Sequence, residues 1–180
     1  EFKSGFISLA GLPNAGKSSL IQAVSHARPK IASYPFTTLT PQVGVVELSG
    51  FRTMMIADIP GIIEGAAGGK GLGIQFLKHV ERTKLLVFVL DISPFADQSA
   101  AEAMTTLRHE IEAFGHGLAQ KPYVIAANKT DMDPDGAGLQ GLIDCLDADD
   151  AARVMAISAL QRTGLDTLLE NLYSRLNPVE

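Results

Sequence analysis

The chain has 180 residues, of which 46% are hydrophobic and 19% charged, a composition that suits one globular α/β domain with a sizeable core. Its formal net charge of −5 provides no global basic field for holding nucleic acid. There is no signal peptide, no apolar run of about 18 residues and only one cysteine, Cys145, so we expect a cytoplasmic protein without a membrane span or an intrachain disulfide.

The spacing of apolar residues predicts strands that alternate with helices. In chain order we expect a strand at 6–10, a helix at 17–26, a loop at 28–42, a hairpin of strands at 43–48 and 52–58, a glycine-rich segment at 60–73, a helix at 74–83, a strand at 85–91, a helix at 98–114, a strand at 123–127, a helix at 138–146, a strand at 153–157 and a helix at 165–176. This order predicts an α/β fold with a six-stranded, mostly parallel sheet, one antiparallel strand and helices on both faces.

A glycine-rich motif follows the first predicted strand and opens the first helix. The segment Gly11–Ser18 (GLPNAGKS) fits G-x-x-x-x-G-K-[ST], whose backbone N–H groups and helix N-terminus attract phosphate. We expect Lys17 to reach the β- and γ-phosphates of a nucleotide and Ser18 to ligate Mg²⁺. The alternative is a glycine-rich turn with a surface lysine. The nucleotide-binding residues that we predict here are Asn14, Ala15, Gly16, Lys17, Ser18 and Ser19.

A carboxylate at the end of another strand completes the predicted magnesium site. Asp58 closes the apolar strand at 52–58 and begins the D-x-x-G pattern that ends at Gly61. In nucleotide-hydrolysing P-loop proteins such a carboxylate holds the Mg²⁺ shell, and we expect the Gly61 N–H to sense the γ-phosphate. An aspartate at a strand end is by itself often only a turn former. The order of the motifs along the chain strengthens the functional interpretation.

The motif N-K-x-D follows the strand at 123–127 and predicts the base that is bound. Guanine presents two donors, N1–H and the 2-amino group, and the carboxylate of Asp131 can accept both. Adenine would leave that charge unpaired, a mismatch that discriminates strongly. We expect the Lys129 stem to cover the base and Asn128 to join this loop to the phosphate loop. The backbone of Ser158, Ala159 and Leu160, after the last strand, can offer N–H groups to the guanine O6.

Together these motifs resemble those of translation-factor-related GTPases, and the segments between them resemble the Obg family. Tyr34–Pro41 (YPFTTLTP) is similar to the Obg switch I, and 58–65, 69–73 and 76–83 are similar to its glycine-rich switch II and the helix that follows. The resemblance implies a Ras-like P-loop G domain in which Thr38 ligates Mg²⁺ and meets the γ-phosphate.

The resemblance also sets expectations for domains and partners. The family carries a glycine-rich domain before the G domain; only ten residues precede Gly11 here, so we interpret 1–180 as a single G domain without that domain or a C-terminal one. We expect a monomer that does not bind membranes, and the family implies a ribosome or rRNA partner, large-subunit assembly and stress signalling by guanosine tetraphosphate.

The residues around the phosphate motif predict slow hydrolysis. Ras-type enzymes orient water with a Gln after D-x-x-G, but Ile62 stands there and cannot hydrogen-bond water. We assign catalytic roles to Lys17, Thr38, Gly61 and Asn14, the last as a ligand for K⁺ by analogy with related GTPases. Three alternatives are left open: Asn14 is a simple turn residue, Glu64 contacts the attacking water or is only a surface carboxylate, and Arg28 acts as a finger in cis or is only solvated.

Two functional hypotheses follow. The first is a slow GTPase that acts as a timed switch, with Mg²⁺ and K⁺ as candidate cofactors. The second is a nucleotide-sensing binding module whose GDP- or GTP-bound shape docks on a partner, with hydrolysis incidental. An ATP-using enzyme is disfavoured by Asp131.

Overall fold

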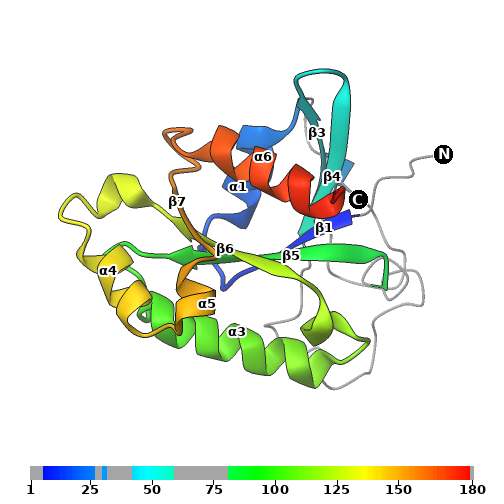
Figure 1. Cartoon of the computed structure of the whole chain (residues 1–180). Helices are drawn as coiled ribbons and strands as arrows, with labels where there is room; N and C mark the ends of the chain where they lie inside the picture. The colour runs from blue at the N-terminus through cyan, green and yellow to red at the C-terminus, as the bar shows by residue number, and fades with distance from the viewer. Residues whose placement is uncertain (1–5, 27–29, 32–41, 59–80, 179–180) are drawn as a thin grey trace.

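The computed structural model describes residues 6–26, 30–31, 42–58 and 81–178, which form a seven-stranded sheet in the order β2-β3-β4-β1-β5-β6-β7 (Figure 1). The strands are β1 (Phe6–Ala10), β2 (Lys30–Ile31), β3 (Gln42–Leu48), β4 (Arg52–Asp58), β5 (Thr83–Asp91), β6 (Tyr123–Asn128) and β7 (Val154–Ile157). β3 is antiparallel to both of its neighbours, and the other pairs are parallel. The predicted six-stranded sheet with one antiparallel strand is confirmed. The two-residue β2 adds a further edge strand within the segment that the sequence assigns to a loop.

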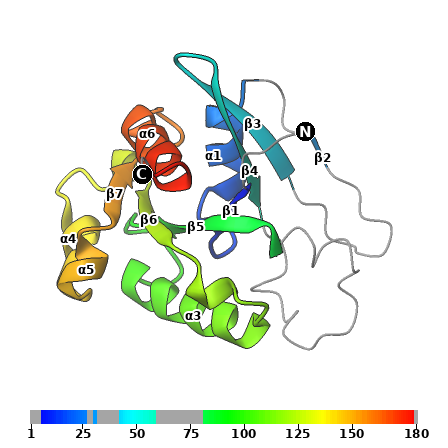
Figure 2. The same cartoon turned by 45° about the vertical axis from the view of Figure 1, so that its right-hand side comes forward.

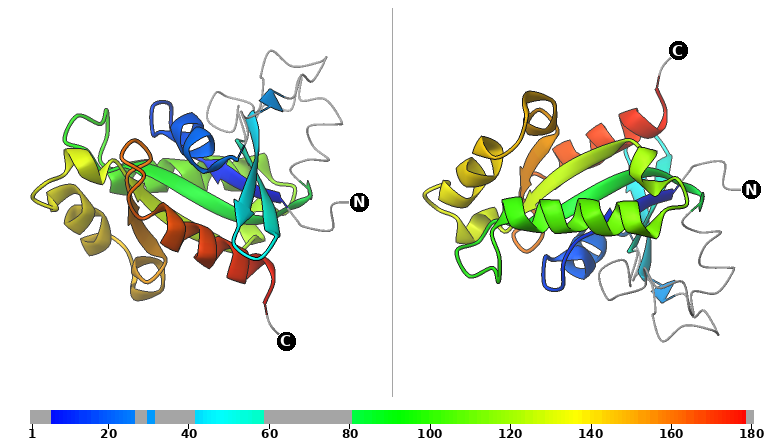
Figure 3. Two further views of the ribbon diagram at one scale, coloured as in Figure 1. Left: turned by 90° about the horizontal axis from the view of Figure 1, so that it is seen from above. Right: turned by 90° about the horizontal axis from the view of Figure 1, so that it is seen from below.

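Helices cover both faces of the sheet, as predicted. They are α1 (Lys17–Val24), α3 (Ala100–Phe114), α4 (Ala137–Asp144), α5 (Ala148–Ala151) and α6 (Leu165–Leu176), with 3-10 turns η2 (Leu118–Gln120) and η3 (Thr130–Met132). α1 and α6 lie on one face, and α3 lies on the other (Figure 3). None of the helices in the described part of the chain combines the length and hydropathy that a membrane span requires.

Alternate residues of β5 enter two separate cores, which explains its continuous apolar sequence. Leu85, Val87 and Val89 pack with the apolar faces of α1 and α6. Leu86, Phe88 and Leu90 pack against α3 and α4 on the opposite face. The prediction of a strand buried on both faces is therefore confirmed.

Several element boundaries differ from the sequence-based expectation by one or two residues, and two of these differences, in α1 and β5, have a clear physical reason. α1 ends at Val24 instead of residue 26, because the Ser25 hydroxyl donates to the Ile21 carbonyl and the His26 N–H donates to Val45 in β3. Thr83 does not end a helix but begins β5, where its buried hydroxyl lies 2.7 Å from that of Ser8 in β1. The rest of the predicted helix, 74–80, lies outside the described residues.

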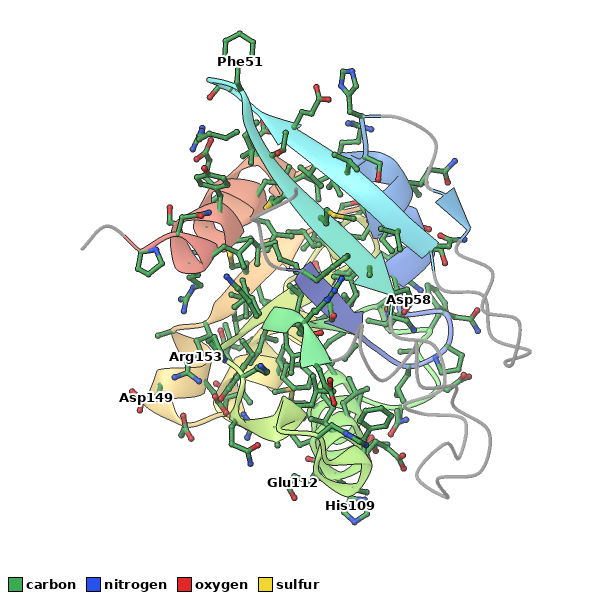
Figure 4. All side chains as sticks on the ribbon, turned by 90° about the vertical axis from the view of Figure 1, so that its right-hand side faces the viewer. Phe51, Asp58, His109, Glu112, Asp149 and Arg153 are labelled. Carbon is green, nitrogen blue, oxygen red and sulfur yellow. The ribbon has the colours of Figure 1, made fainter. Side chains whose placement is uncertain are left out.

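The hairpin and the strand order determine which loops lie next to one another at the edge of the sheet. In Figure 2 β2 and the β3–β4 hairpin stand on one side of the domain and β7 on the other. The hairpin turn includes Gly50 and Phe51, both with positive φ. Figure 4 shows Phe51 at the tip of the hairpin and Asp58 at the far end of β4. The carboxyl ends of β4, β1, β5, β6 and β7 therefore share one edge of the sheet, and every predicted motif in the described residues lies at that edge.

Candidate nucleotide site

The loop from Gly11 to Gly16 curls around the side chain of Lys17. Its ammonium Nζ donates to the carbonyl of Gly11 at 2.6 Å and to that of Leu12 at 3.4 Å. The Ala15 N–H closes the loop by donating to Leu12 O at 3.1 Å, and Asn14 takes a left-handed φ of 66°. This strand–loop–helix arrangement places the positive charge of Lys17 inside the loop, as phosphate binding requires.

Two glycines allow this loop to pack against its neighbours. A Cβ at Gly11 would lie 2.7 Å from the carbonyl oxygen of Val89 in β5. A Cβ at Gly16, where φ is 100°, would lie 2.2 Å from Nδ2 of Asn128. Only glycine fits at both positions. The two glycines of G-x-x-x-x-G are therefore required for close packing as well as for backbone conformation.

The oxygen ligands predicted for Mg²⁺ flank the loop on the β4 side. Register places Asp58 beside Leu9 of β1, and Ser18 is the second residue of α1, directly after the loop. A hydroxyl and a carboxylate are hard oxygen donors of the kind that Mg²⁺ prefers, so these residues fit the ion. Within the described ranges there is no cluster of three or more His, Cys, Asp or Glu side chains. Thr38 and Gly61 lie outside the described residues.

Asn128 joins three loops at the carboxyl edge. Its side chain is buried, with Nδ2 donating to Ala15 O at 2.9 Å and Oδ1 accepting from the Ala159 N–H at 3.0 Å. The first contact reaches the phosphate loop, as the sequence predicts. The second uses an N–H that we expected to be offered to guanine. Asn128 thus fixes the phosphate loop relative to the loops after β6 and β7.

The carboxylate of Asp131 is oriented by a buried serine. Ser158 Oγ donates to Asp131 Oδ1 at 2.6 Å and accepts from the Gln161 N–H at 3.0 Å. Two backbone hydrogen bonds between Ser158 and Thr163 close this loop. Leu160 is exposed on the same loop. From the sequence we expected only backbone donors in this loop, because no local pattern reveals the role of the Ser158 hydroxyl.

Lys129 forms an ion pair that the sequence analysis also misses. Its Nζ lies 2.5 Å from Oδ2 of Asp91, the last residue of β5. Burial raises the pKa of the Asp91 carboxyl, but hydrogen bonds from Lys129 and Ser93 outweigh it, so the net pKa lies below its ordinary value. A signal was present, because Asp91 ends a buried strand just as Asp58 and Asn128 do.

The other candidate residues are only partly placed. Ser19 is exposed in the first turn of α1. Arg28 and Glu64 lie outside the described residues. The structure therefore places the phosphate loop, Asp58 and the residues predicted for base recognition at one edge of the sheet. The residues predicted for base recognition come from two separate segments of the chain, one at the end of β6 and one after β7.

Comparison with known proteins identifies the family to which this arrangement belongs. The model of the family described as "50S ribosome-binding GTPase" matches residues 6–129, which include the phosphate loop and extend to Lys129. The chain belongs to this GTPase family. The resemblance to Obg proteins is confirmed, since the chain is 47% identical to the GTPase Obg of Chlorobium phaeobacteroides over 171 residues, 94% of this chain and 49% of that protein. It is 46% identical to the GTPase Obg of Thermosynechococcus vestitus, over 94% of this chain and 50% of that protein.

The chain thus spans about half the length of the curated relatives that it matches. Among solved structures, Era in complex with MgGDPNP and a 16S ribosomal RNA fragment superposes with a TM-score of 0.69 at 23% identity, over 100% of this chain and 59% of that one. The G domain of the T. maritima FeoB iron transporter gives a TM-score of 0.65 at 21% identity, over 95% and 98% of the two chains. At this level of identity the likeness confirms the P-loop GTPase fold.

Proposed function

We propose that this G domain binds GTP and GDP with Mg²⁺ and hydrolyses GTP slowly. One observation carries the proposal: Asn128 ties the phosphate loop to the segment that holds Asp131, whose carboxylate is oriented by Ser158. A phosphate-binding loop and an acceptor for the two donors of guanine are thereby held together by contacts within the protein. Preorganisation of this kind lowers the cost of binding.

Each residue has a distinct task in this function. Lys17 exchanges its carbonyl contacts for the β- and γ-phosphates, and Asp131 accepts from N1–H and the 2-amino group of guanine. Ser18 and Asp58 hold Mg²⁺, which neutralises phosphate charge. Thr38 joins them when the γ-phosphate is present, and the Gly61 N–H senses that group. The turnover is slow because Ile62, where Ras-type enzymes have a Gln, cannot orient water.

A nucleotide titration of the wild type and of Asp131→Asn tests the base assignment. The wild type should bind GDP and GTP, and excess ATP should not compete. In Asp131→Asn the amide pairs with the carbonyl that replaces the guanine 2-amino group in xanthine, so GTP affinity should fall and affinity for xanthosine triphosphate should rise. Ser18→Ala should weaken both GDP and GTP binding, whereas Thr38→Ala should spare GDP. Unchanged GTP affinity in Asp131→Asn would refute the proposal.

Asn14 is the candidate for catalytic assistance. Its carboxamide oxygen is a neutral, hard ligand at an exposed, left-handed position of the phosphate loop, suited to K⁺ beside phosphate oxygens. Turnover should then be faster in KCl than in NaCl at equal ionic strength, and Asn14→Ala should remove the difference while leaving GDP binding intact. Equal rates in the two salts would return attention to Glu64, Arg28 or a partner residue.

The cellular role rests on the relatives. Family membership supports action on the large ribosomal subunit in the cytoplasm, and the Era structure with its rRNA fragment supports an RNA or ribosome partner. The alternative is a nucleotide-sensing module in which hydrolysis is incidental. Measuring turnover of the monomer with and without large ribosomal subunits distinguishes them, because a timed switch should be accelerated by its partner whereas a sensor should bind without acceleration.

A further inference from the structure

The ion pair between Asp91 and Lys129 connects two strand ends at the nucleotide site. Register pairs Asp91 of β5 with Asn128 of β6, and the Ile92 N–H donates to Asn128 O at 3.1 Å. Oδ1 of Asp91 accepts from the Ser93 N–H at 2.9 Å, which leaves Oδ2 for Lys129. Both side chains are shielded, with 16% of Asp91 and 28% of Lys129 exposed. The backbone therefore holds one carboxylate oxygen of Asp91, and the other oxygen contacts the Lys129 ammonium group.

The backbone of Lys129 is fixed as well. Its φ is 75°, in the left-handed region, and its carbonyl accepts from the Met132 N–H at 2.9 Å, which closes the turn that carries Asp131. A free lysine side chain loses rotamer entropy when it is ordered. Because the turn holds the backbone of Lys129 and Asp91 holds its ammonium group, most of this entropy is lost on folding instead of on ligand binding.

The pair also lies beside the phosphate loop. Asp91 and Lys129 line a cavity of about 240 Å³ together with the segment from Leu12 to Ala15 on one side and the segment from Phe95 to Gln98 on the other. Lys129 thus lies at the same cavity as the phosphate loop. A stem that is ordered there is already in place for a bound base.

We propose that Asp91 is a positioning residue for guanine-nucleotide binding, which anchors the Lys129 ammonium group so that the lysine stem is ordered at the base site. This inference rests on the proposed function. Asp91 does not contact the nucleotide; it acts through Lys129. The opposite arrangement, in which the ion pair must break before a nucleotide binds, predicts that removal of Asp91 tightens binding.

A double-mutant cycle with Asp91→Asn and Lys129→Met tests this coupling. The asparagine keeps an oxygen for the Ser93 N–H, so the turn is preserved, but its NH2 group replaces the charged oxygen that accepts from Lys129, so the ion pair is lost. Affinity and dissociation rate are measured by stopped flow with a fluorescent GDP analogue. Asp91→Asn should weaken binding roughly 5- to 20-fold, mainly by faster dissociation, because a shielded charge-assisted hydrogen bond is lost. In the Lys129→Met background the same change should have little effect, and in the Lys129→Arg background it should again weaken binding.

Asp97→Asn is the matched control, because Asp97 is an exposed carboxylate on the wall of the same cavity. It should leave GDP affinity unchanged. Unchanged or tighter binding by Asp91→Asn, or equal weakening in the wild-type and Lys129→Met backgrounds, would overturn the inference. Circular dichroism and thermal unfolding of each variant without nucleotide establish that it is folded. If the wild type itself does not prefer GDP to ADP, the proposed function fails, and this outcome is distinct from failure of the Asp91 inference.

Discussion

Gly16 satisfies two requirements that no other residue type meets. Its φ is 100°, and an added Cβ would lie 2.2 Å from Nδ2 of Asn128. A methyl group there must displace the Asn128 side chain, which joins Ala15 in the loop after β1 to Ala159 in the loop after β7. Gly16→Ala is therefore expected to lower GDP affinity by about 100-fold, the effect of losing a buried polar junction of roughly 3 kcal/mol. Isothermal titration checks this value.

Gly50 in the hairpin turn provides the control for backbone strain alone. Its φ is 73°, but no atom lies within 4 Å of the Cβ that alanine would add. Gly50→Ala should cost about 1 kcal/mol of stability and leave nucleotide affinity unchanged. If Gly16→Ala, like Gly50→Ala, leaves nucleotide affinity unchanged, the packing of Gly16 against Asn128 is not what allows the phosphate loop to bind a nucleotide.

The residues of the site differ in how far local sequence could reveal them. Lys17, Asp58 and Asp131 each belong to a short motif at a predicted strand end, so type and spacing sufficed to propose their roles. Asp91 and the Ser158 hydroxyl act on partners 38 and 27 positions away in the chain. Their pairing depends on which strand ends become neighbours, and that information is not local.

Two glycines of α4 allow a prediction about a single element. Gly141 faces open space, whereas a Cβ at Gly138 would lie 2.0 Å from the backbone carbonyl oxygen of Ile92. Gly141→Ala should raise the free energy of unfolding by about 0.5–1 kcal/mol, because alanine loses less entropy in a helix. Gly138→Ala should lower it by about 1–3 kcal/mol, because backbone must move.

Urea denaturation of these two variants gives both values in one experiment. Similar effects of the two changes would show that helix propensity, not contact with the segment after β5, decides the stability of α4.

Elements were predictable in proportion to their length. The long amphipathic helices α3 and α6 follow from apolar spacing, and α3 begins with a capping box formed by Ser99 and Glu102. The four-residue α5 is too short for any periodicity, and β2 is only two residues long. Both are missing from the sequence-based prediction because tertiary contacts, not local preference, maintain such short elements.

At the end of the sheet opposite the candidate nucleotide site, a buried carboxylate connects several elements of the molecule. Asp150 in α5 is only 3% exposed, accepts from Tyr123 Oη of β6, and pairs with Arg108 of α3 at 2.5 Å and with Arg153 at 3.7 Å. Figure 4 shows Arg153 and Asp149 on the same side of the molecule. Burial raises the pKa of the Asp150 carboxyl, but hydrogen bonds from Tyr123 and Arg108 and the two arginine charges outweigh it, so the net pKa lies below its ordinary value.

Because the folded pKa is depressed, the stability that ionised Asp150 contributes is fully present above the ordinary value of 3.8 and is lost as the pH falls through the folded pKa. Asp150→Asn should lower the free energy of unfolding at pH 7 by about 2 kcal/mol, less than for a fully buried pair because both guanidinium groups reach water. It should also flatten the loss of stability in acid. Asp149→Asn, at an exposed position, should change neither, and an equally steep acid limb in Asp150→Asn would contradict the assignment.

The sequence by itself determined the order of the longer strands and helices, the two-sided burial of β5 and the positions of the motifs proposed to bind nucleotide, because these depend on spacing within short windows and on glycine at restricted positions. The tertiary structure decided the strand order, which places β1 between β4 and β5 and so sets Asp58 on one side of the loop after β1 and the loops after β6 and β7 on the other. It also decided the contacts of Asn128, Asp91 and Asp150. Their partners come from separate elements, and only the packing of the sheet and its helices brings those atoms within hydrogen-bonding distance.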